Sequence, residues 1–240
     1  MILAAGRGTR LGPLGETTPK PLLEVGGRTL LERVARRLVG AGAERLIVNV
    51  HHHAAQIERH LAELDLGVEL VISREEEMPL ETGGGVLHAA GHFRKVGPFL
   101  LHNADVISEI DLVRLLAAQR GSGALATLAV HERETSRFLL FDEDGLIGWE
   151  NLATGKSRTV REPRGAVRHF AFAGIHAVDP GFLDLVEERG AFSIIEPYLR
   201  LSAAGQRIAP HDVTGDRWME IGTPERLEAA RRSMETGGAE

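Results

Sequence analysis

Short apolar runs alternate with amphipathic stripes along the first half of the chain. Residues 45–50 and 68–72 are runs rich in branched apolar side chains, a pattern typical of buried strands. Between them, apolar residues from 54 to 64 recur every three or four positions, which predicts a helix. A further strand is expected over 98–102. Strands and helices in this order predict an α/β fold, with a Rossmann-like, mostly parallel mixed sheet covered by helices on both faces.

The pattern changes beyond about residue 120, where strand-like segments follow one another closely. Residues 124–130, 138–141 and 146–149 predict strands, and Asp142–Gly145 is typical of a hairpin turn. The sheet should therefore carry an antiparallel, strand-rich addition. Further helices are expected at 29–40, beginning after Thr82, at 181–189 and at 193–204. Further strands are expected at 170–178 and in a segment that ends at Glu220. A final helix should have Thr223 as its N-cap and Pro224 at its first position.

The amino terminus combines an apolar strand with a glycine-rich basic loop. Met1–Ala5 predicts the strand, Gly6–Arg10 the loop, and Pro19–Pro21 a rigid element that carries Lys20. Glycines let backbone N–H groups approach a phosphate chain, and arginine and lysine bring positive charge to the same place. This segment therefore predicts a phosphate-binding loop. Its continuation through Gly12, Pro13, Gly15 and Pro19 contains too many helix breakers to predict a helix.

Two common nucleotide-binding motifs are excluded. The Gly-Lys-Ser at Gly155–Ser157 has Glu150 where a P-loop needs its first glycine, so we interpret it as a turn. A dinucleotide fingerprint would need a third glycine where Leu11 stands.

Composition narrows the function classes. The 240 residues, 43% of them hydrophobic, suffice for one globular domain, and the absence of cysteine excludes a disulfide framework and a thiolate nucleophile. The net charge is −6 and the basic residues are scattered, so no nucleic-acid partner is expected. No apolar run approaches membrane-spanning length and no signal peptide is apparent. We expect a cytoplasmic protein, monomeric or homodimeric, with a small-molecule partner.

Acidic and polar residues follow two predicted strands. Asn103 and Asp105 come after the strand at 98–102, and Glu220 ends the last strand. Ligands in open α/β sheets sit beyond the carboxyl ends of strands, so these side chains could converge. Two carboxylates beside a polyphosphate indicate Mg²⁺.

Two further clusters have a structural and a functional interpretation each. Three glycines at Gly83–Gly85 are unfavourable at a helix start, so either the segment is a flexible cap or the backbone approaches something closely there. We favour the second interpretation: a nucleotide base lies against Gly83 and Gly84, with Glu81 or backbone groups at its edge. His51–His53 could suggest zinc, but consecutive side chains point in different directions, so we interpret them as polar junction residues.

Taken together, several segments closely resemble the motifs of the sugar-1-phosphate nucleotidyltransferases, in the family's order. They are Leu3–Leu11, Pro19–Leu22, Pro79–Gly85, Asn103–Asp105, Phe172–Ile175 and Trp218–Pro224. Within the family, the chain looks most like the N-acetylmuramic acid 1-phosphate uridylyltransferase branch, with mannose-1-phosphate guanylyltransferases as near neighbours. The resemblance implies the nucleotide-diphospho-sugar transferase fold in a single domain, with a nucleotide-binding half (1–120), a sugar-binding half (121–222) and a C-terminal helix and tail (223–240).

The resemblance also implies a reaction, in which a nucleoside triphosphate, UTP before GTP, and a sugar 1-phosphate give a nucleotide sugar and pyrophosphate by in-line attack with Mg²⁺. Arg10 and Lys20 would be catalytic, and Asp105 and Glu220 would hold the metal. The residues implied in nucleotide binding are Leu3, Ala4, Ala5, Gly6, Gly8, Thr9, Arg10, Glu81, Thr82 and Gly83, and those implied in sugar binding are Asn103, Glu150 and Gly174.

The chain departs from the family at several points. Glu220 replaces the usual second aspartate, Gly15 stands where relatives often have threonine, and Arg161–Pro163 is the nearest match to a Glu-Lys-Pro element that supplies a second phosphate-contacting lysine in related thymidylyltransferases. The chain also begins on the first strand itself. The alternatives are a non-catalytic nucleotide-sugar sensor or regulatory subunit on the same fold, and a cytidylyltransferase acting on a non-sugar alcohol phosphate.

Overall fold

The computed structural model describes residues 1–93 and 96–236. The predicted tail over 237–240 lies outside the described residues. The strands are β1 (Ile2–Leu3), β2 (Glu24–Val25), β3 (Arg28–Thr29), β4 (Arg45–Val50), β5 (Glu69–Arg74), β6 (Phe99–Asn103), β7 (Val106–Ser108), β8 (Ala126–His131), β9 (Arg137–Asp142), β10 (Gly145–Asn151), β11 (Lys156–Thr159), β12 (Arg168–Val178), β13 (Ile208–Asp212) and β14 (Trp218–Glu220). The α-helices are α1 (Pro13–Thr17), α2 (Leu30–Gly40), α3 (Ala54–Glu63), α4 (Glu81–His88), α5 (Leu112–Ser122), α6 (Gly181–Leu185), α7 (Ile195–Ala203) and α8 (Pro224–Thr236), and the 3₁₀ helices are η1 (Thr9–Leu11), η2 (Lys20–Leu22) and η3 (Ala90–His92).

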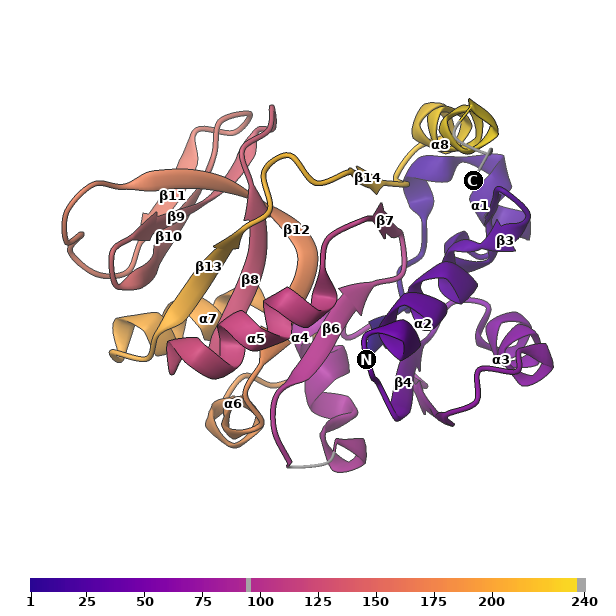
Figure 1. The fold of residues 1–240 in the computed structure, drawn as a ribbon, viewed down its shortest axis with the longest axis horizontal. Coiled ribbons are helices and arrows are strands. Elements are labelled where there is room, and N and C mark those ends of the chain that lie inside the picture. Colours follow the sequence, from indigo (N-terminus) through magenta and orange to yellow (C-terminus); the bar gives the residue numbers. More distant parts are fainter. Residues whose placement is uncertain (94–95, 237–240) are drawn as a thin grey trace.

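A ten-stranded mixed sheet runs through the described part of the molecule in the order β11-β10-β9-β12-β6-β1-β4-β5, with β8 and β13 branching from β12. Strands β6, β1, β4 and β5 are parallel, whereas β12 pairs antiparallel with β6, β8 and β9. The antiparallel strands extend to one end of the molecule (Figure 1). The predicted α/β class with an antiparallel addition is confirmed.

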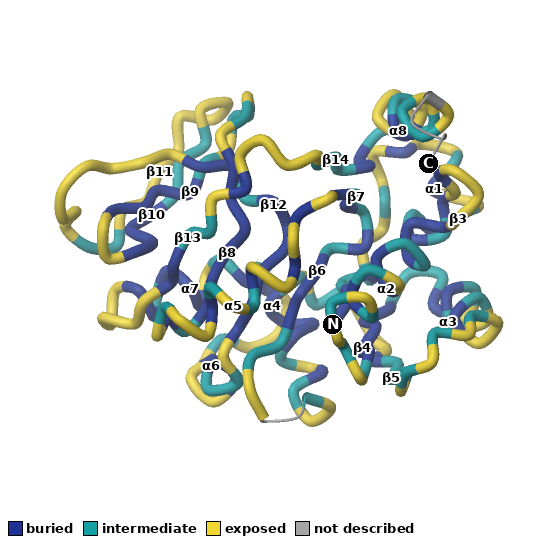
Figure 2. Tube along the Cα trace, viewed as in Figure 1, coloured by how far each residue is buried: buried dark blue, intermediate teal, exposed yellow. Residues whose placement is uncertain are grey.

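Helices cover both faces of the sheet, as predicted. The apolar faces of α2, α3 and α5 pack on one side with Val48 and Leu100, and α4, α6 and α7 pack on the other with Ile47 and Leu101. Because successive side chains of a strand point to opposite faces, adjacent residues such as Ile47 and Val48 belong to different hydrophobic cores. Figure 2 shows the buried strands enclosed by helices with exposed outer surfaces. A smaller cluster under α8, around Leu227 and Leu11, attaches that helix to the amino-terminal loop.

The structure corrects the prediction around the amino-terminal loop. The segment judged too rich in helix breakers for a helix contains α1, which has Pro13 at its start and ends at Thr17, before Pro19. Proline is tolerated in the first helical turn because the N–H it lacks has no partner there. Elements α5, β2, β3, β7, β11 and β13 were not predicted.

Helix α6 ends at Leu185 and is therefore shorter than the helix predicted over 181–189. The Arg200 guanidinium donates to the Leu185 carbonyl at 2.8 Å and to the Glu188 carboxylate, which satisfies the helix end. The Gly155 turn was predicted correctly and joins β10 to β11. Of the described helices, none has the length and apolar character needed to cross a membrane.

Candidate active site

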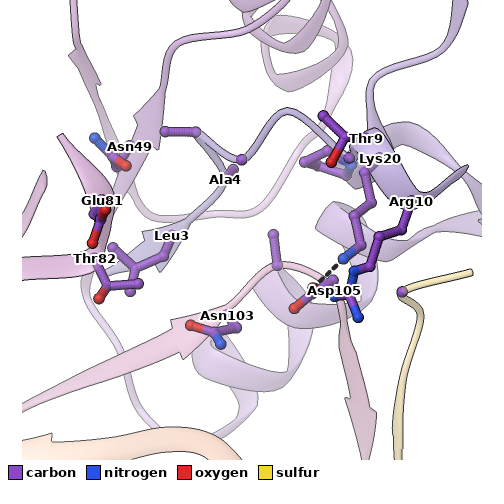
Figure 3. A pocket seen from close by; sticks show the side chains of 16 residues that line it. Leu3, Ala4, Thr9, Arg10, Lys20, Asn49, Glu81, Thr82, Asn103 and Asp105 are labelled. Carbon is purple, nitrogen blue, oxygen red and sulfur yellow. Dashed lines mark hydrogen bonds and ion pairs between the residues drawn. The ribbon is translucent and has the colours of Figure 1, made fainter. Parts of the chain in front are cut away.

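The predicted phosphate-binding loop lines a cavity of about 330 Å³ beyond the carboxyl ends of β1 and β6. Its lining residues are Leu3, Ala4, Ala5, Gly6, Gly8, Thr9, Arg10, Lys20, Pro21, Asn49, Glu81, Thr82, Asn103, Ala104, Asp105 and Gly222. Arg10 and Lys20 lie at one end of this first cavity, and Asn49, Glu81 and Thr82 lie at the opposite end (Figure 3). One end of the cavity therefore carries two cationic side chains. The other end carries the uncharged polar side chains of Asn49 and Thr82 and the acidic side chain of Glu81.

Lys20 and Asp105 form an ion pair at the cationic end (Figure 3). Lys20 sits on η2, which the rigid Pro19–Pro21 element forms, and its side chain is only 12% exposed. Asp105 lies in the two-residue turn between β6 and β7, beyond the end of the predicted strand. The proline-rich segment thus holds an ammonium group against the carboxylate at the sheet edge.

Glu220 lies beside Asp105 because their strands pair. Strand β14 runs antiparallel to β7, with Glu220 opposite Val106, and the Ile221 N–H donates to the Asp105 carbonyl at 2.8 Å. The two acids that were predicted to converge are therefore neighbours.

Two guanidinium groups hold the Glu220 carboxylate. Arg10 donates to it at 2.9 Å and Arg226 at 3.1 Å. Burial of the carboxyl favours its neutral form, but the hydrogen bond and charge of Arg10, with Lys20 and Arg226, outweigh burial and lower the pKa of Glu220. Glu220 is therefore an ionised carboxylate at the junction of the amino-terminal loop and α8.

A second, larger cavity of about 930 Å³ adjoins the first, and Arg10 and Asn103 line both. All three residues predicted to bind sugar, Asn103, Glu150 and Gly174, line this second cavity. Its aromatic lining residues are Phe138, Trp149, Phe172 and Trp218. A cavity with aromatic walls and a few polar groups is typical of a small-molecule site.

Gly174 and Asn103 meet at an irregularity in β12. The pairing with β8 shifts between Phe172 and His176, and Gly174 has a φ of +75° there. A Cβ atom at Gly174 would lie 2.7 Å from the Asn103 amide nitrogen, so a larger residue would displace that side chain. Glycine at this bulge therefore allows Asn103 to occupy the boundary between the two cavities.

The glycine cluster of α4 is packed against protein. A Cβ atom at Gly83 would lie 2.4 Å from the Phe192 ring, and one at Gly84 would lie 2.4 Å from the Gly190 carbonyl oxygen. The expected close approach is thus made by the segment between α6 and α7. Glu81 and Thr82 line the first cavity, but Gly83 is buried behind them and is absent from the described lining.

Sequence reasoning missed several lining residues. Asn49 is the last residue but one of a predicted strand that otherwise looked apolar, and its amide donates to the buried Glu75 carboxylate at 2.7 Å. A polar residue inside an apolar run was the available signal. Arg133 and Trp149 of the second cavity lay in no recognised motif, and Trp218 lay in the Trp218–Pro224 match without a predicted role in binding.

The His51–His53 run behaves as junction residues. His53 precedes α3 with a φ of +54°, and His51 contacts the Glu75 carbonyl at 2.9 Å. Within the described ranges, no group of three or more His, Asp or Glu side chains is arranged to hold a metal ion.

Comparison with known proteins identifies the family. The family profile described as "MobA-like NTP transferase domain" matches residues 1–170. The chain belongs to this family.

Two relatives illustrate the similarity of this family member. N-acetylmuramate alpha-1-phosphate uridylyltransferase of Caulobacter vibrioides is 32% identical over 245 residues, covering 98% of this chain and 96% of that protein. Mannose-1-phosphate guanylyltransferase catalytic subunit beta of Drosophila pseudoobscura pseudoobscura is 35% identical over 230 residues, covering 93% of this chain but only 59% of that protein. The predicted resemblance to sugar-1-phosphate nucleotidyltransferases is confirmed.

The fold agrees with a solved structure of similar kind. A putative glucose-1-phosphate thymidylyltransferase from Bacillus anthracis superposes with a TM-score of 0.80 at 17% identity, covering 97% of this chain and 93% of that one. This likeness supports the fold.

The two acids of this NTP transferase domain are suited to a divalent cation that also binds phosphate. Asp105 and Glu220 are adjacent and offer only oxygen ligands, and Glu220 is ionised. Mg²⁺ is commonly held by one or two carboxylates together with substrate phosphates. The donor set therefore fits Mg²⁺ completed by a nucleotide, and does not need a third protein ligand.

Proposed function

We propose that the chain transfers a nucleotidyl group from a nucleoside triphosphate to a sugar 1-phosphate and releases pyrophosphate. The observation that carries the proposal is the convergence of Arg10, Lys20, Asp105 and Glu220 where the two cavities meet. One cavity would hold the triphosphate and the other the sugar, so the reacting phosphates would meet at this junction. In this proposal the nucleotide-binding half (1–120) lines most of the first cavity and the sugar-binding half (121–222) lines most of the second, while Arg10 and Asn103 line both.

The chain's own residues would act by charge and position. The attacking oxygen belongs to the sugar phosphate, and the bond from the α-phosphorus to the pyrophosphate leaving group breaks as the new phosphorus–oxygen bond forms. Lys20 would stabilise charge on the α-phosphate and the incoming phosphate, and Arg10 would hold the leaving pyrophosphate. No covalent enzyme intermediate is required.

The substrate would replace the contacts that these cations make in the free protein. Lys20 pairs with Asp105 and Arg10 pairs with Glu220. A polyphosphate that takes over both cations would free Asp105 of Lys20 and leave Glu220 paired with Arg226 alone. Mg²⁺, when bound by Asp105 and Glu220, would neutralise charge on the phosphates.

The far end of the first cavity would receive the base and ribose, against Leu3, Ala4, Glu81 and Thr82. We propose UTP ahead of GTP, because the uridylyl relative matches along 96% of its length and the guanylyl relative along 59%. Asn103, Glu150 and Gly174 would contact the sugar.

A pyrophosphate-release assay tests the proposal. The full chain is incubated with Mg²⁺, each of the four common nucleoside triphosphates and a panel of sugar 1-phosphates. We expect turnover with at least one pair, and with UTP before GTP. The absence of turnover with every pair, together with tight binding of a nucleotide sugar, would favour the non-catalytic sensor instead.

A further inference from the structure

Arg161–Pro163, the nearest match to the family element that supplies a second phosphate-binding cation, uses its arginine for an ion pair outside the two cavities. Arg161, in the Arg161–Pro163 match to the family element, donates to both carboxylate oxygens of Asp142, at 2.6 and 2.7 Å. The Asp142 side chain is fully buried, and the hydrogen bonds from Arg161 hold its pKa far below the usual range. A bidentate pair of this kind fixes Arg161 in a structural role at the turn after β9. Neither residue lines a described cavity that adjoins Asp105.

Arg133 stands in the second cavity with its guanidinium already fixed. Its Cζ lies 4.5 Å from the centre of the Trp218 ring, and its Nε donates to His131 Nε2 at 3.0 Å. Trp218 is itself held, because its indole N–H donates to the Ala173 carbonyl at 2.8 Å. Arg133 is half-buried, and these contacts hold it by one edge. Its two terminal nitrogens have no hydrogen-bond acceptor within the described residues.

The acceptor of that hydrogen bond must be a neutral histidine. Burial lowers the pKa of His131, and the neighbouring Arg133 charge lowers it further, against the opposing effect of Asp212. A neutral imidazole with its proton on Nδ1 can accept from Arg133 at Nε2 without like-charge repulsion. His131 therefore orients the guanidinium and leaves its full charge available to a ligand.

Among the described residues that line the second cavity, no carboxylate forms an ion pair with Arg133. The three carboxylates that line it all have other partners: Glu196 pairs with Arg158 at 2.8 Å, Glu220 pairs with Arg10 and Arg226, and Glu150 contacts the His169 ring at 2.6 Å. In the part of the chain that the structure describes, no carboxylate lies within ion-pair distance of Arg133. Burial lowers the pKa of Arg133; the charge of Glu220 opposes this effect and that of Arg226 adds to it, so Arg133 lies in the field of both groups. Arg137 also lines the cavity, but it is exposed.

Building on the proposed function, we infer that Arg133 binds the phosphate of the incoming sugar 1-phosphate, in place of a cation at 161–163. A phosphate at this position contacts the terminal nitrogens of Arg133 on one side and lies beside the Arg10–Glu220–Arg226 cluster on the other. The planar guanidinium offers two parallel N–H donors to two phosphate oxygens. Because Trp218 and His131 hold it before substrate binds, little rotamer freedom is lost on binding.

The kinetic test separates the two substrates of the proposed reaction. Arg133→Ala should raise KM for the sugar 1-phosphate by about 10-fold or more, as expected for loss of a charge-assisted hydrogen bond. KM for the nucleoside triphosphate should stay within about twofold of the parent value, as it would if the nucleotide site were intact. Arg133→Lys should restore part of the loss. Arg164→Ala, which removes an exposed arginine outside both cavities, is the matched control and should leave both KM values unchanged.

A binding measurement tests the role of Arg133 without requiring turnover. The chain has two tryptophans, Trp149 and Trp218, so Trp149→Phe leaves Trp218 as the only indole reporter beside Arg133. Titration with inorganic phosphate should change its fluorescence, and adding Arg133→Ala should weaken the apparent affinity by about 10-fold. Thermal melting of each variant confirms that it is folded, and Arg133→Lys serves if the alanine variant is not.

The outcomes separate this inference from the proposed function. Equal changes in both KM values, or a phosphate titration unaffected by Arg133→Ala, would overturn the inference and leave Arg133 as a support for Trp218. If the parent chain turns over no substrate pair, the proposed function fails, and the phosphate titration still decides whether Arg133 binds the anion.

Discussion

Lys20 shows how one residue joins a local sequence pattern to a site formed across the chain. Prolines on both sides fix its backbone, and Asp105 receives its ammonium group inside the first cavity. In the free protein the pair is nearly neutral. In the proposed reaction the lysine charge is needed most when negative charge accumulates on the phosphates, so its contribution should appear mainly in the transition state.

We therefore expect Lys20→Ala to lower kcat by on the order of 10²-fold or more, a loss of transition-state stabilisation. Steady-state kinetics with saturating substrates measure this. Arg7→Ala is the matched control, because Arg7 is an exposed cation of the same loop that does not line the described cavities. A change in kcat within twofold for Lys20→Ala would refute the role assigned to this residue.

Asp105 allows a separate prediction about the metal. Asp105→Asn keeps the size of the side chain but removes its charge, so a hard cation loses a favoured ligand. We expect the variant to lose Mg²⁺-dependent turnover across a titration of Mg²⁺. Asp216→Asn changes an exposed acid shortly before β14 and should behave like the parent chain. An unaltered Mg²⁺ dependence in Asp105→Asn would place the ion elsewhere.

Residue types in the loop could be interpreted from sequence because their chemistry is local. Gly8, Arg10 and Lys20 lie within a short segment, so a phosphate-binding role could be predicted without knowing the fold. Arg133 and Trp218 could not be recognised in the same way. Their possible role depends on the contact between the Trp218 ring, on β14, and the Arg133 guanidinium, in the loop after β8. No short-range sequence pattern predicts that contact.

At the scale of elements, α4 is the clearest case of a helix shaped by what it packs against. Its glycines lower its intrinsic stability, and they are explained by the approach of Phe192 and the Gly190 carbonyl. The backbone N–H of Gly83 also donates to the Phe192 carbonyl at 2.9 Å, so the helix start is bound to the segment before α7. The close packing positions Glu81 and Thr82 at the cavity.

We expect Gly83→Ala to destabilise the protein by about 1–3 kcal/mol, because overpacking against Phe192 outweighs the gain in helix propensity. Urea unfolding measures the change. Gly121→Ala, in helix α5, is the matched control: a Cβ atom there meets no described atom within 4 Å, and the substitution should stabilise by about 0.5–1 kcal/mol. Equal effects of the two substitutions would contradict the packing explanation.

The elements that were predicted have regular patterns, and those missed have interrupted ones. Strand β13 contains Pro210, which argues against a central strand, but β13 pairs only with β8 among the described strands and so lies at an edge where proline is tolerated. Helix α5 buries Gln119, whose amide donates to the Ala124 carbonyl at 2.6 Å and whose oxygen accepts from Thr127. A buried polar residue that is satisfied by tertiary contacts breaks the apolar stripe on which helix prediction depends.

At the scale of the whole molecule, the central sheet buries three histidines among the described residues, and two of them have almost no access to solvent. His102 on β6 and His176 on β12 are 0% and 1% exposed. Burial lowers the pKa of His102 to about 4 and that of His176 to about 3. His176 lies 2.7 Å from the Tyr198 hydroxyl, which gives the neutral ring a polar partner. Both histidines are therefore uncharged in the folded protein at neutral pH.

Stability should fall as the pH is lowered below 6.5. The unfolded chain then binds a proton at each histidine and the folded chain does not, so protonation favours unfolding. Each residue contributes a slope of roughly 1.4 kcal/mol per pH unit down to its folded pKa. Urea unfolding between pH 8 and 5 measures this dependence, and His176→Gln should remove the share of the slope that His176 contributes. A free energy of unfolding that is constant from pH 6.5 to 5 would contradict the prediction.

The fold class and the two faces of the sheet could be predicted because they follow from apolar periodicity over long stretches. The convergence of Asp105 and Glu220 could be predicted from their places at strand ends, but the contact of Arg10 with Glu220 could not. Arg10 and Glu220 are 210 positions apart, and their contact depends on β14 reaching back to β7. Periodicity within a window carries no information on such a pairing.

The pairing of β14 with β7 has a consequence for how the protein is made. Synthesis on the ribosome proceeds from the amino terminus, so Arg10, Lys20 and Asp105 emerge well before Glu220. A nascent chain that has not yet extruded β14 can present cations to a passing nucleotide, but it has only one of the two neighbouring acids. In the proposed reaction both acids are needed, so the chain would become active only after β14 has been synthesised and has paired with β7.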